Sequence, residues 1–463
     1  MKLFLLSLLL MGCTAAPHAW DAPWPKDPVP YVPTEVSVAS PAVQGRFPID
    51  LPTVLRLAGA NNLDIAFVRE KVHEAHARTQ LAEEQLWPRL GPELTFRRHE
   101  GLTQATEGTF LDVDKQQTFV GLRAGLRWDV GEAIFSTLAA SRRYEGAQAN
   151  LEATKEKVLL EAAQAYYDLV REHLNEQVAD ASATVSEKLA SELEASVRAG
   201  RGFQGDVLRA RVQHSSSRLE VLRAREGMKV AALRLSTLLR LSPGIELLPV
   251  EGIPAPLALV DTHVTDSEIL EEALERRPEI TAGLREIEAS RREKEGAAWG
   301  PLIPAVIAEA APGGLGPVLS DLESTADYGV SLQWRFGPGG LLDFGRYGLT
   351  QAKSRQAEIN FERIRQGVTE QLMASLVEFR AKVEQMKLAE SAVKDAEESL
   401  KLNQERQAGN IGLPLEVLQA EDALARARMN LYAAVVEYNQ AQLRAFTYAG
   451  RKHSAEQSPA GGS

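Results

Sequence analysis

The chain has 463 residues, a formal net charge of −11 and a single cysteine. The length allows two or three domains, the acidic balance disfavours a nucleic-acid partner, and one cysteine excludes an intrachain disulfide framework or a CxxC site. Beyond the N-terminus no run of eighteen apolar residues occurs, which excludes a protein with several membrane-spanning helices. A soluble helical protein, or a membrane protein that spans by strands, remains.

Residues 1–12 are typical of a secretory signal, with one lysine before a short apolar core. The core ends in Leu10-Met11-Gly12-Cys13, which resembles a bacterial lipobox in which Cys13 becomes acylated. Acyl chains on Cys13 would anchor the protein stably. Thr14 in the next position favours the outer membrane over the inner one.

Neither end of the chain is predicted to form a domain of its own, and the N-terminal segment is expected to lie along the folded body. Nine prolines stand between positions 17 and 52, which predicts an extended, lipidated tether over residues 13–49. Residues 451–463 are small and polar, so we expect a disordered tail.

The rest of the sequence contains an internal duplication. The segment AGRGFQGDVLRA at 199–210 resembles AGNIGLPLEVLQA at 408–420. Downstream, apolar positions recur with spacings of 4 and 3, the pattern of helices that pack at shallow angles, at a constant offset of 210. We therefore predict two similar units, 50–245 and 265–450, within one duplicated architecture.

Each unit is predicted to run helix, strand, loop, strand, long helix, glycine turn and return helix. No proline stands between Pro92 and Pro243 or between Pro338 and Pro414, which permits very long helices. In the first unit we expect a short helix at 63–86, a long helix at 134–199 and a return helix at 205–241. In the second unit we expect a short helix at 279–298, a long helix at 347–408 and a return helix at 414–447. This predicts a wall of hairpins, with two short helices stacked end to end beside each long one.

Four segments alternate with a period of two residues and are expected to be strands: about 93–99, 118–130, 304–311 and 327–337. In the second of them Leu122 and Leu126 share one face, and Arg123 and Arg127 share the other. This pattern fits a barrel with lipid outside and water inside, and it equally fits a solvent-exposed sheet packed on helices. Four strands cannot close a barrel, which needs about eight, and open edges are not tolerated in lipid. Membrane-spanning strands would therefore require several copies of the chain.

Two such units behind a signal peptide, with hairpins that turn at paired glycines, resemble the TolC-like outer-membrane efflux factor family. The resemblance implies a mainly α fold with a small β part, and a homotrimer whose strands close one barrel above a periplasmic helical tunnel. It implies a lipid-anchored outer-membrane channel of a tripartite efflux or type I secretion system. Such a channel exports small molecules, metal ions or polypeptides passively, together with a periplasmic adaptor and an inner-membrane transporter. No cofactor and no enzymatic turnover are implied.

The resemblance also places two kinds of site near the glycine turns. Adaptor docking is expected at the hairpin tips, and a channel constriction at an acidic residue just past each tip. Three copies of such an acid would form an anionic ring that favours cations; alternatively, each acid complements the dipole at the start of its helix. The residues concerned are Gly200, Gly202, Gly409, Gly412 and Leu413 for docking, and Asp206 and Glu416 for the constriction.

Other motifs carry no function. The glycines at 200, 202 and 205 match a dinucleotide fingerprint in spacing, but a helix rather than a strand is predicted before them. His73 and His76 share a helical face without a third metal ligand, so no metal site is expected. No catalytic motif is present, and we expect no enzyme. The alternative to a channel is a periplasmic coiled-coil scaffold lipoprotein without a pore.

Overall fold

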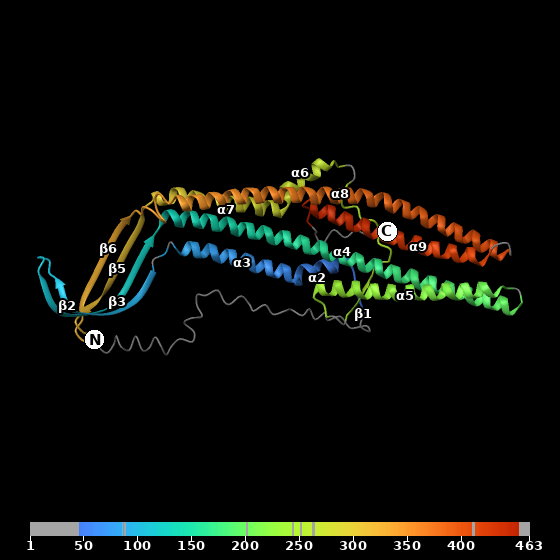
Figure 1. Ribbon diagram of the computed structural model, residues 1–463, viewed down its shortest axis with the longest axis horizontal. Coiled ribbons are helices and arrows are strands. Elements are labelled where there is room, and N and C mark those ends of the chain that lie inside the picture. The colour runs from blue at the N-terminus through green and yellow to red at the C-terminus, as the bar shows by residue number, and fades with distance from the viewer. Residues whose placement is uncertain are drawn as a thin grey trace.

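The computed structural model describes residues 46–452 apart from 86, 88, 201, 243–244, 251, 262–263 and 410–412, so that the predicted signal, Cys13, Gly412 and most of the predicted tail lie outside it. The molecule is elongated, with a β-sheet at one end and two helical hairpin turns at the other (Figure 1). The prediction of a mainly helical fold with a small β part is confirmed.

The first unit contains two short helices, a strand pair and a helical hairpin. Helices α2 (Leu51–Asn61) and α3 (Leu63–Glu84) precede strands β2 (Arg89–Gln104) and β3 (Phe110–Trp128). Helix α4 (Val130–Arg198) has 69 residues and returns as α5 (Gln204–Leu239). At 1.5 Å per residue α4 is about 100 Å long.

The second unit repeats this order. Helices α6 (Asp266–Arg276) and α7 (Pro278–Trp299) and the 3₁₀ turn η1 (Gly300–Leu302) precede strands β5 (Ala305–Gly316) and β6 (Glu323–Gln333). Helix α8 (Phe344–Ala408) then returns as α9 (Pro414–Tyr448). The helices agree closely with the expected ranges, because proline-free stretches with a continuous apolar stripe leave few alternatives to a helix.

The strands differ more from their expected ranges. Strand β2 is much longer than 93–99, and β3 and β6 begin before the expected residues 118 and 327. Strand β3 also ends at Trp128 rather than at 130, because α4 begins there, and β6 ends at Gln333 rather than at 337. The underestimated parts mix polar and apolar residues without a regular alternation, as in Phe110-Leu111-Asp112 of β3, so they lack the pattern by which a strand is recognised in sequence.

The four strands form one antiparallel sheet in the order β2-β3-β5-β6. The register pairs Leu94 with Val120, Ala124 with Ala310, and Ala308 with Val330. The β2–β3 hairpin continues past the end of β5, since the last β3–β5 pair is Thr118 with Gly316. The sheet therefore joins the two units directly.

A second, smaller sheet was not expected from the sequence. Strand β1 (Arg46–Ile49) pairs in parallel with β4 (Glu246–Pro249). The last four residues of the predicted 13–49 tether are thus part of the folded body. Ile49 and Leu247 are fully buried there and pack into the main core with Tyr166, Leu169 and Leu235 of α4 and α5.

The segment between the two units is bound to α9 by buried amides. Gln442 is 1 % exposed, and its side-chain oxygen accepts hydrogen bonds from the backbone N–H groups of Leu259 (3.2 Å) and Val260 (2.9 Å). Asn439 accepts from the N–H of Leu257 at 2.8 Å. These bonds satisfy backbone groups that would otherwise be buried without partners.

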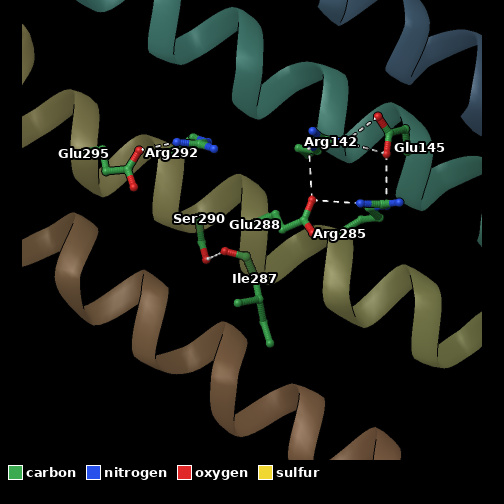
Figure 2. Close-up of polar contacts among 8 residues, drawn as sticks. All are labelled: Arg142, Glu145, Arg285, Ile287, Glu288, Ser290, Arg292 and Glu295. Carbon is green, nitrogen blue, oxygen red and sulfur yellow. Dashed lines mark hydrogen bonds and ion pairs between the residues drawn. The ribbon is translucent and has the colours of Figure 1, made fainter. Parts of the chain in front are cut away.

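The two units also meet along α4 and α7 through ion pairs (Figure 2). Arg142 and Glu145 of α4 form a closed set of four charges with Arg285 and Glu288 of α7, with N–O distances between 2.9 and 3.3 Å. Beside them, Arg143 contacts Glu286 and Glu293. The hydrogen bond that Arg143 donates to the Glu293 carboxylate raises the pKa of Arg143 above its ordinary value.

Within the described part of the chain, no helix combines the length and the apolar character that crossing a membrane requires.

Candidate functional site

The sheet has one apolar face that the described residues leave uncovered. Leu94, Leu122 and Val330 lie on this face and are 70 %, 47 % and 79 % exposed. The register places them with other apolar side chains on the same side, namely Phe96, Val120, Ala308, Ala310, Tyr328 and Leu332. A face of this size exposed to water would be unfavourable, so it indicates a contact with lipid or with another protein.

The opposite face of the sheet carries charged residues. Arg123 forms an ion pair with Glu93 across the β2–β3 pair. Both residues line a cavity of about 790 Å³ at the junction of sheet and helices, together with Arg127, Glu309 and Glu132. The sheet therefore separates an apolar surface from a charged, water-accessible one.

The first hairpin tip is built around Gly200. Its φ of +74° lies in the left-handed region, which glycine adopts without strain and other residues avoid. A Cβ at Gly202 would lie only 2.9 Å from the Cγ2 atom of Val197, so the turn also requires a small residue there. Phe203 follows as the N-cap of α5 and is 68 % exposed.

The second tip differs in its conformation. Gly409 caps α8 with a φ of −77°, which any residue can adopt. Leu413 precedes α9 and is 63 % exposed. Both tips lie at the same end of the molecule, far from the sheet (Figure 1). The sequence thus identified the positions of the two turns, but not the difference between their glycines.

The two acidic candidates lie in the first turns of the return helices. Asp206 of α5 pairs with Arg209 of the same helix at 3.2 Å. Glu416 of α9 accepts a hydrogen bond from the Leu413 N–H at 3.3 Å and lies 3.7 Å from Arg406 of α8. Each acid therefore has local partners in its own hairpin, as expected for a first-turn carboxylate.

Glu421 of α9, one turn further from the tip, was not singled out in the sequence. Its carboxylate accepts a hydrogen bond from Gln404 of α8 at 3.4 Å. Burial raises the pKa of Glu421, and the nearby Arg428 partly opposes this effect. Only burial distinguishes Glu421 from the many exposed acids of these helices, so sequence patterns could not find it.

Helix α5 has a second apolar stripe that the sequence analysis also missed. Ala210, Val221 and Leu235 of the first stripe are buried. On another side of the helix, apolar residues stay exposed at helical spacing: Leu208, Val212, Leu219, Leu222, Val230 and Leu233. Two offset heptad patterns in one helix indicate two partners, so this stripe was detectable in principle.

The described residues contain no group of three or more His, Cys, Asp or Glu placed to hold a metal ion. His76 packs against the ring of Tyr144, with 5.2 Å between the ring centroids. Gly200 and Gly202 belong to the turn between the helices α4 and α5, and Gly205 lies in the first turn of α5.

Comparisons with a protein-family model and with solved structures agree on the class of protein that this chain resembles. Residues 54–239 match the family model described as outer membrane efflux protein, whereas no curated protein sequence matches the chain. The fold is similar to that of the outer membrane protein VceC from Vibrio cholerae, with a TM-score of 0.73 and 20 % identity over 87 % of this chain and 96 % of that chain.

Two further solved structures share the fold. The CmeC outer membrane channel of Campylobacter jejuni gives a TM-score of 0.73 at 16 % identity, over 86 % of this chain and 85 % of that chain. The open MtrE outer membrane channel of Neisseria gonorrhoeae gives a TM-score of 0.72 at 17 % identity, over 87 % of this chain and 89 % of that chain. Residues 54–239 thus match the model of the outer membrane efflux protein family, and the chain as a whole has the TolC-like fold.

Proposed function

We propose that the protein is the outer-membrane exit duct of a tripartite efflux or secretion system and exports its substrates passively. The observation that carries the proposal is the four-stranded sheet with an uncovered apolar face and a charged opposite face. A water-filled barrel in lipid needs this arrangement. A coiled-coil scaffold without a pore would have no use for it.

The sheet requires further copies of the chain to close. Among the described strands, β2 and β6 each pair on one side only. Unpaired backbone groups are too costly in lipid to remain at such edges. Three copies would join β6 of one to β2 of the next and give about twelve strands, which is within the range of membrane barrels.

The helices offer a matching surface for a trimer. The exposed stripe of α5, which includes Leu208, Leu219 and Val230, lies away from the partner helix α4. In a closed tunnel a neighbouring copy covers this stripe, and the apolar area removed from water stabilises the assembly.

The hairpin tips are the proposed docking sites for a periplasmic adaptor that connects to an inner-membrane transporter. Phe203 and Leu413 present exposed apolar side chains at the tips. Glu416 and Asp206 lie one turn above them and are the proposed constriction. Three Glu416 carboxylates would make the tunnel entrance attractive to cations.

Cys13 is the proposed lipid anchor, which would hold the protein in the outer membrane independently of the barrel. Mass spectrometry of the mature protein should find acyl chains on an N-terminal Cys13. A Cys13→Ser chain should lack this mass and still assemble, because the sheet does not depend on the anchor.

The proposed closure can be tested by photo-cross-linking in membranes. Benzoylphenylalanine at Leu94 of β2 or Leu332 of β6 should give covalent dimers and trimers, since each edge strand meets a second copy. The same probe at Leu126 of β3, a strand paired on both sides, is the control and should give none. Absence of cross-linking at both edges would contradict the proposed trimer.

A further inference from the structure

The connection between sheet and long helix differs between the two units. In the first unit only Asp129 separates β3 from α4, whereas residues 334–343 separate β6 from α8 in the second. The first unit demonstrates that the fold does not need a loop of this length to join strand to helix. The 334–343 loop is therefore an addition specific to the second unit.

The loop has a conformation fixed by its own backbone. The Gly337 N–H donates to the Leu341 carbonyl, and the Leu341 N–H donates to the Arg335 carbonyl, both at 2.8 Å. The Asp343 side chain accepts from the Gly339 N–H at 2.8 Å. Gly337 and Gly339 have φ values of +87° and +77°, which require glycine for an unstrained turn. A loop with this many internal bonds presents its side chains in a defined arrangement.

One side of the loop is polar and is held against the start of α4. Arg335 binds Asp129, with 3.0 Å between Nη2 and Oδ1. Just past the loop, Arg346 binds Glu132 of α4 at 2.8 Å. The loop is thereby attached to the first unit at both of its ends.

The loop and the first residue of α8 also expose large apolar side chains. Phe336, Leu342 and Phe344 are 73 %, 70 % and 77 % exposed, and none of the described residues covers them. Leu342 also has a φ of +71°, a conformation that is unfavourable for a residue with a Cβ. Strain and exposure in a single leucine indicate that its outward position has a use.

Two aromatic side chains of the loop, Trp334 and Phe336, continue the alternation of the sheet's apolar face. The alternation of Tyr328, Val330 and Leu332 in β6 runs on through Trp334 and Phe336. The Trp334 ring is half exposed, and its Nε1–H donates to the Leu302 carbonyl at 3.3 Å. An exposed tryptophan with its polar group satisfied is suited to the boundary between lipid tails and headgroups.

We propose that the 334–343 loop is a membrane-interface anchor. Phe336, Leu342 and Phe344 insert at the boundary between headgroups and acyl chains, in the leaflet on the helical side of the sheet. The proposal rests on the proposed function, since it requires the sheet to span a bilayer. Continuity with the apolar face favours lipid as the occupant over a second copy of the chain.

Depth measurement by fluorescence quenching tests the proposal on the full mature chain. In a Cys13→Ser background, single cysteines at Leu342, Phe344, Val330 and Glu398 are labelled with bimane and reconstituted into phosphatidylcholine vesicles that contain brominated lipids. The label at Leu342 should be quenched several-fold more than the one at Glu398, an exposed residue of α8 near the hairpin tip. Its depth should be about 15 Å from the bilayer centre, because the hydrocarbon core is about 30 Å thick.

The other labels separate the possible failures. Phe344 lies in α8 with ordinary helical backbone. The label at Phe344 therefore replaces the one at Leu342 if the Leu342→Cys chain does not fold. Quenching at Val330 without quenching at Leu342 or Phe344 would overturn the anchor and leave the proposed function standing. No quenching at Val330 would overturn both. Labels at 342 and 344 that are protected from brominated lipid and from aqueous iodide alike would place a second copy over the loop, and would also overturn the anchor.

Discussion

Glu416 at the start of α9 faces Arg406 at the end of α8, with 3.7 Å between the carboxylate Oε2 and the guanidinium Nη1. The two side chains are 35 % and 55 % exposed. An exposed pair of this kind contributes about 0–1 kcal/mol and leaves the carboxylate open to solvent. The contact joins the two helices of the second hairpin beside its tip, where the proposed docking and constriction sites meet.

Neutralising Glu416 should weaken cation selectivity. In Glu416→Gln the ring of three carboxylates at the tunnel entrance is lost, so the reversal potential in a salt gradient should move toward that of a non-selective channel. Planar-bilayer recording of the purified channel measures this shift. Glu192→Gln, an exposed acid on α4 paired only within its helix, is the control and should leave the reversal potential unchanged.

Removing Arg406 should have the opposite effect. In Arg406→Gln the Glu416 carboxylate loses its positive neighbour, and cation selectivity should increase. Unchanged selectivity in both Glu416→Gln and Arg406→Gln would exclude Glu416 from the constriction, and Asp206→Asn would then test the other candidate in the same recordings.

The two tip glycines should respond differently to alanine. Gly200→Ala forces a Cβ into a left-handed conformation, which costs about 1–2 kcal/mol, so the last turn of α4 should exchange its amide hydrogens faster. Gly409→Ala is the matched control, because its φ of −77° is open to alanine. Hydrogen exchange followed by mass spectrometry compares them, and equal responses would contradict the assigned turn geometry.

The seam between α4 and α7 should depend on pH through Glu293. Burial alone would raise the pKa of Glu293, but the hydrogen bond and charge of Arg143 outweigh it and lower the pKa below its ordinary value of 4.5. A lowered pKa means that the contact stabilises the folded protein above pH 4.5, and that this contribution is lost as the pH falls through the lowered value.

Glu293→Gln should therefore lower the unfolding temperature at pH 7, by an amount corresponding to about 1 kcal/mol. The difference from the unsubstituted chain should shrink as the pH falls below 4. Glu295→Gln on the same helix removes only the exposed pair with Arg292 (Figure 2) and should change the unfolding temperature little. A Glu293→Gln difference that grows on acidification would contradict the assigned ion pair.

The buried amide of Gln442 should matter more than any exposed pair. Gln442→Leu leaves the N–H groups of Leu259 and Val260 without their acceptor, at a cost of about 1–3 kcal/mol for each. Thermal unfolding should therefore shift to clearly lower temperature. Gln356→Leu, at an exposed position of α8, is the control and should change the unfolding temperature little. A shift no larger than that of the control would show that the segment between the units is not held by α9.

The helical hairpins could be predicted because their signal extends over many residues. The stripe from Ala210 to Leu235 and its copy in α9 define one buried face over many turns, and no proline interrupts α4. The strands were located by their apolar alternation but underestimated in length. Beyond Phe96 the β2–β3 hairpin carries charged pairs such as Arg98 with Asp114, which a polar loop would carry equally well.

Short and non-local features could not be predicted. Strands β1 and β4 have only four residues each, and they are held by pairing across some 200 positions rather than by a local pattern. The contacts of Glu416 with Leu413 and Arg406, and the exposure of Leu342 at a positive φ, depend on three-dimensional geometry that spacing alone does not encode.

The most direct test of the proposed channel is to extract the protein from the outer-membrane fraction in mild detergent and measure its native mass and its conductance in planar bilayers. We predict a homotrimer that forms stable, water-filled pores. A monomer that gives no conductance would contradict the proposed channel and favour the scaffold.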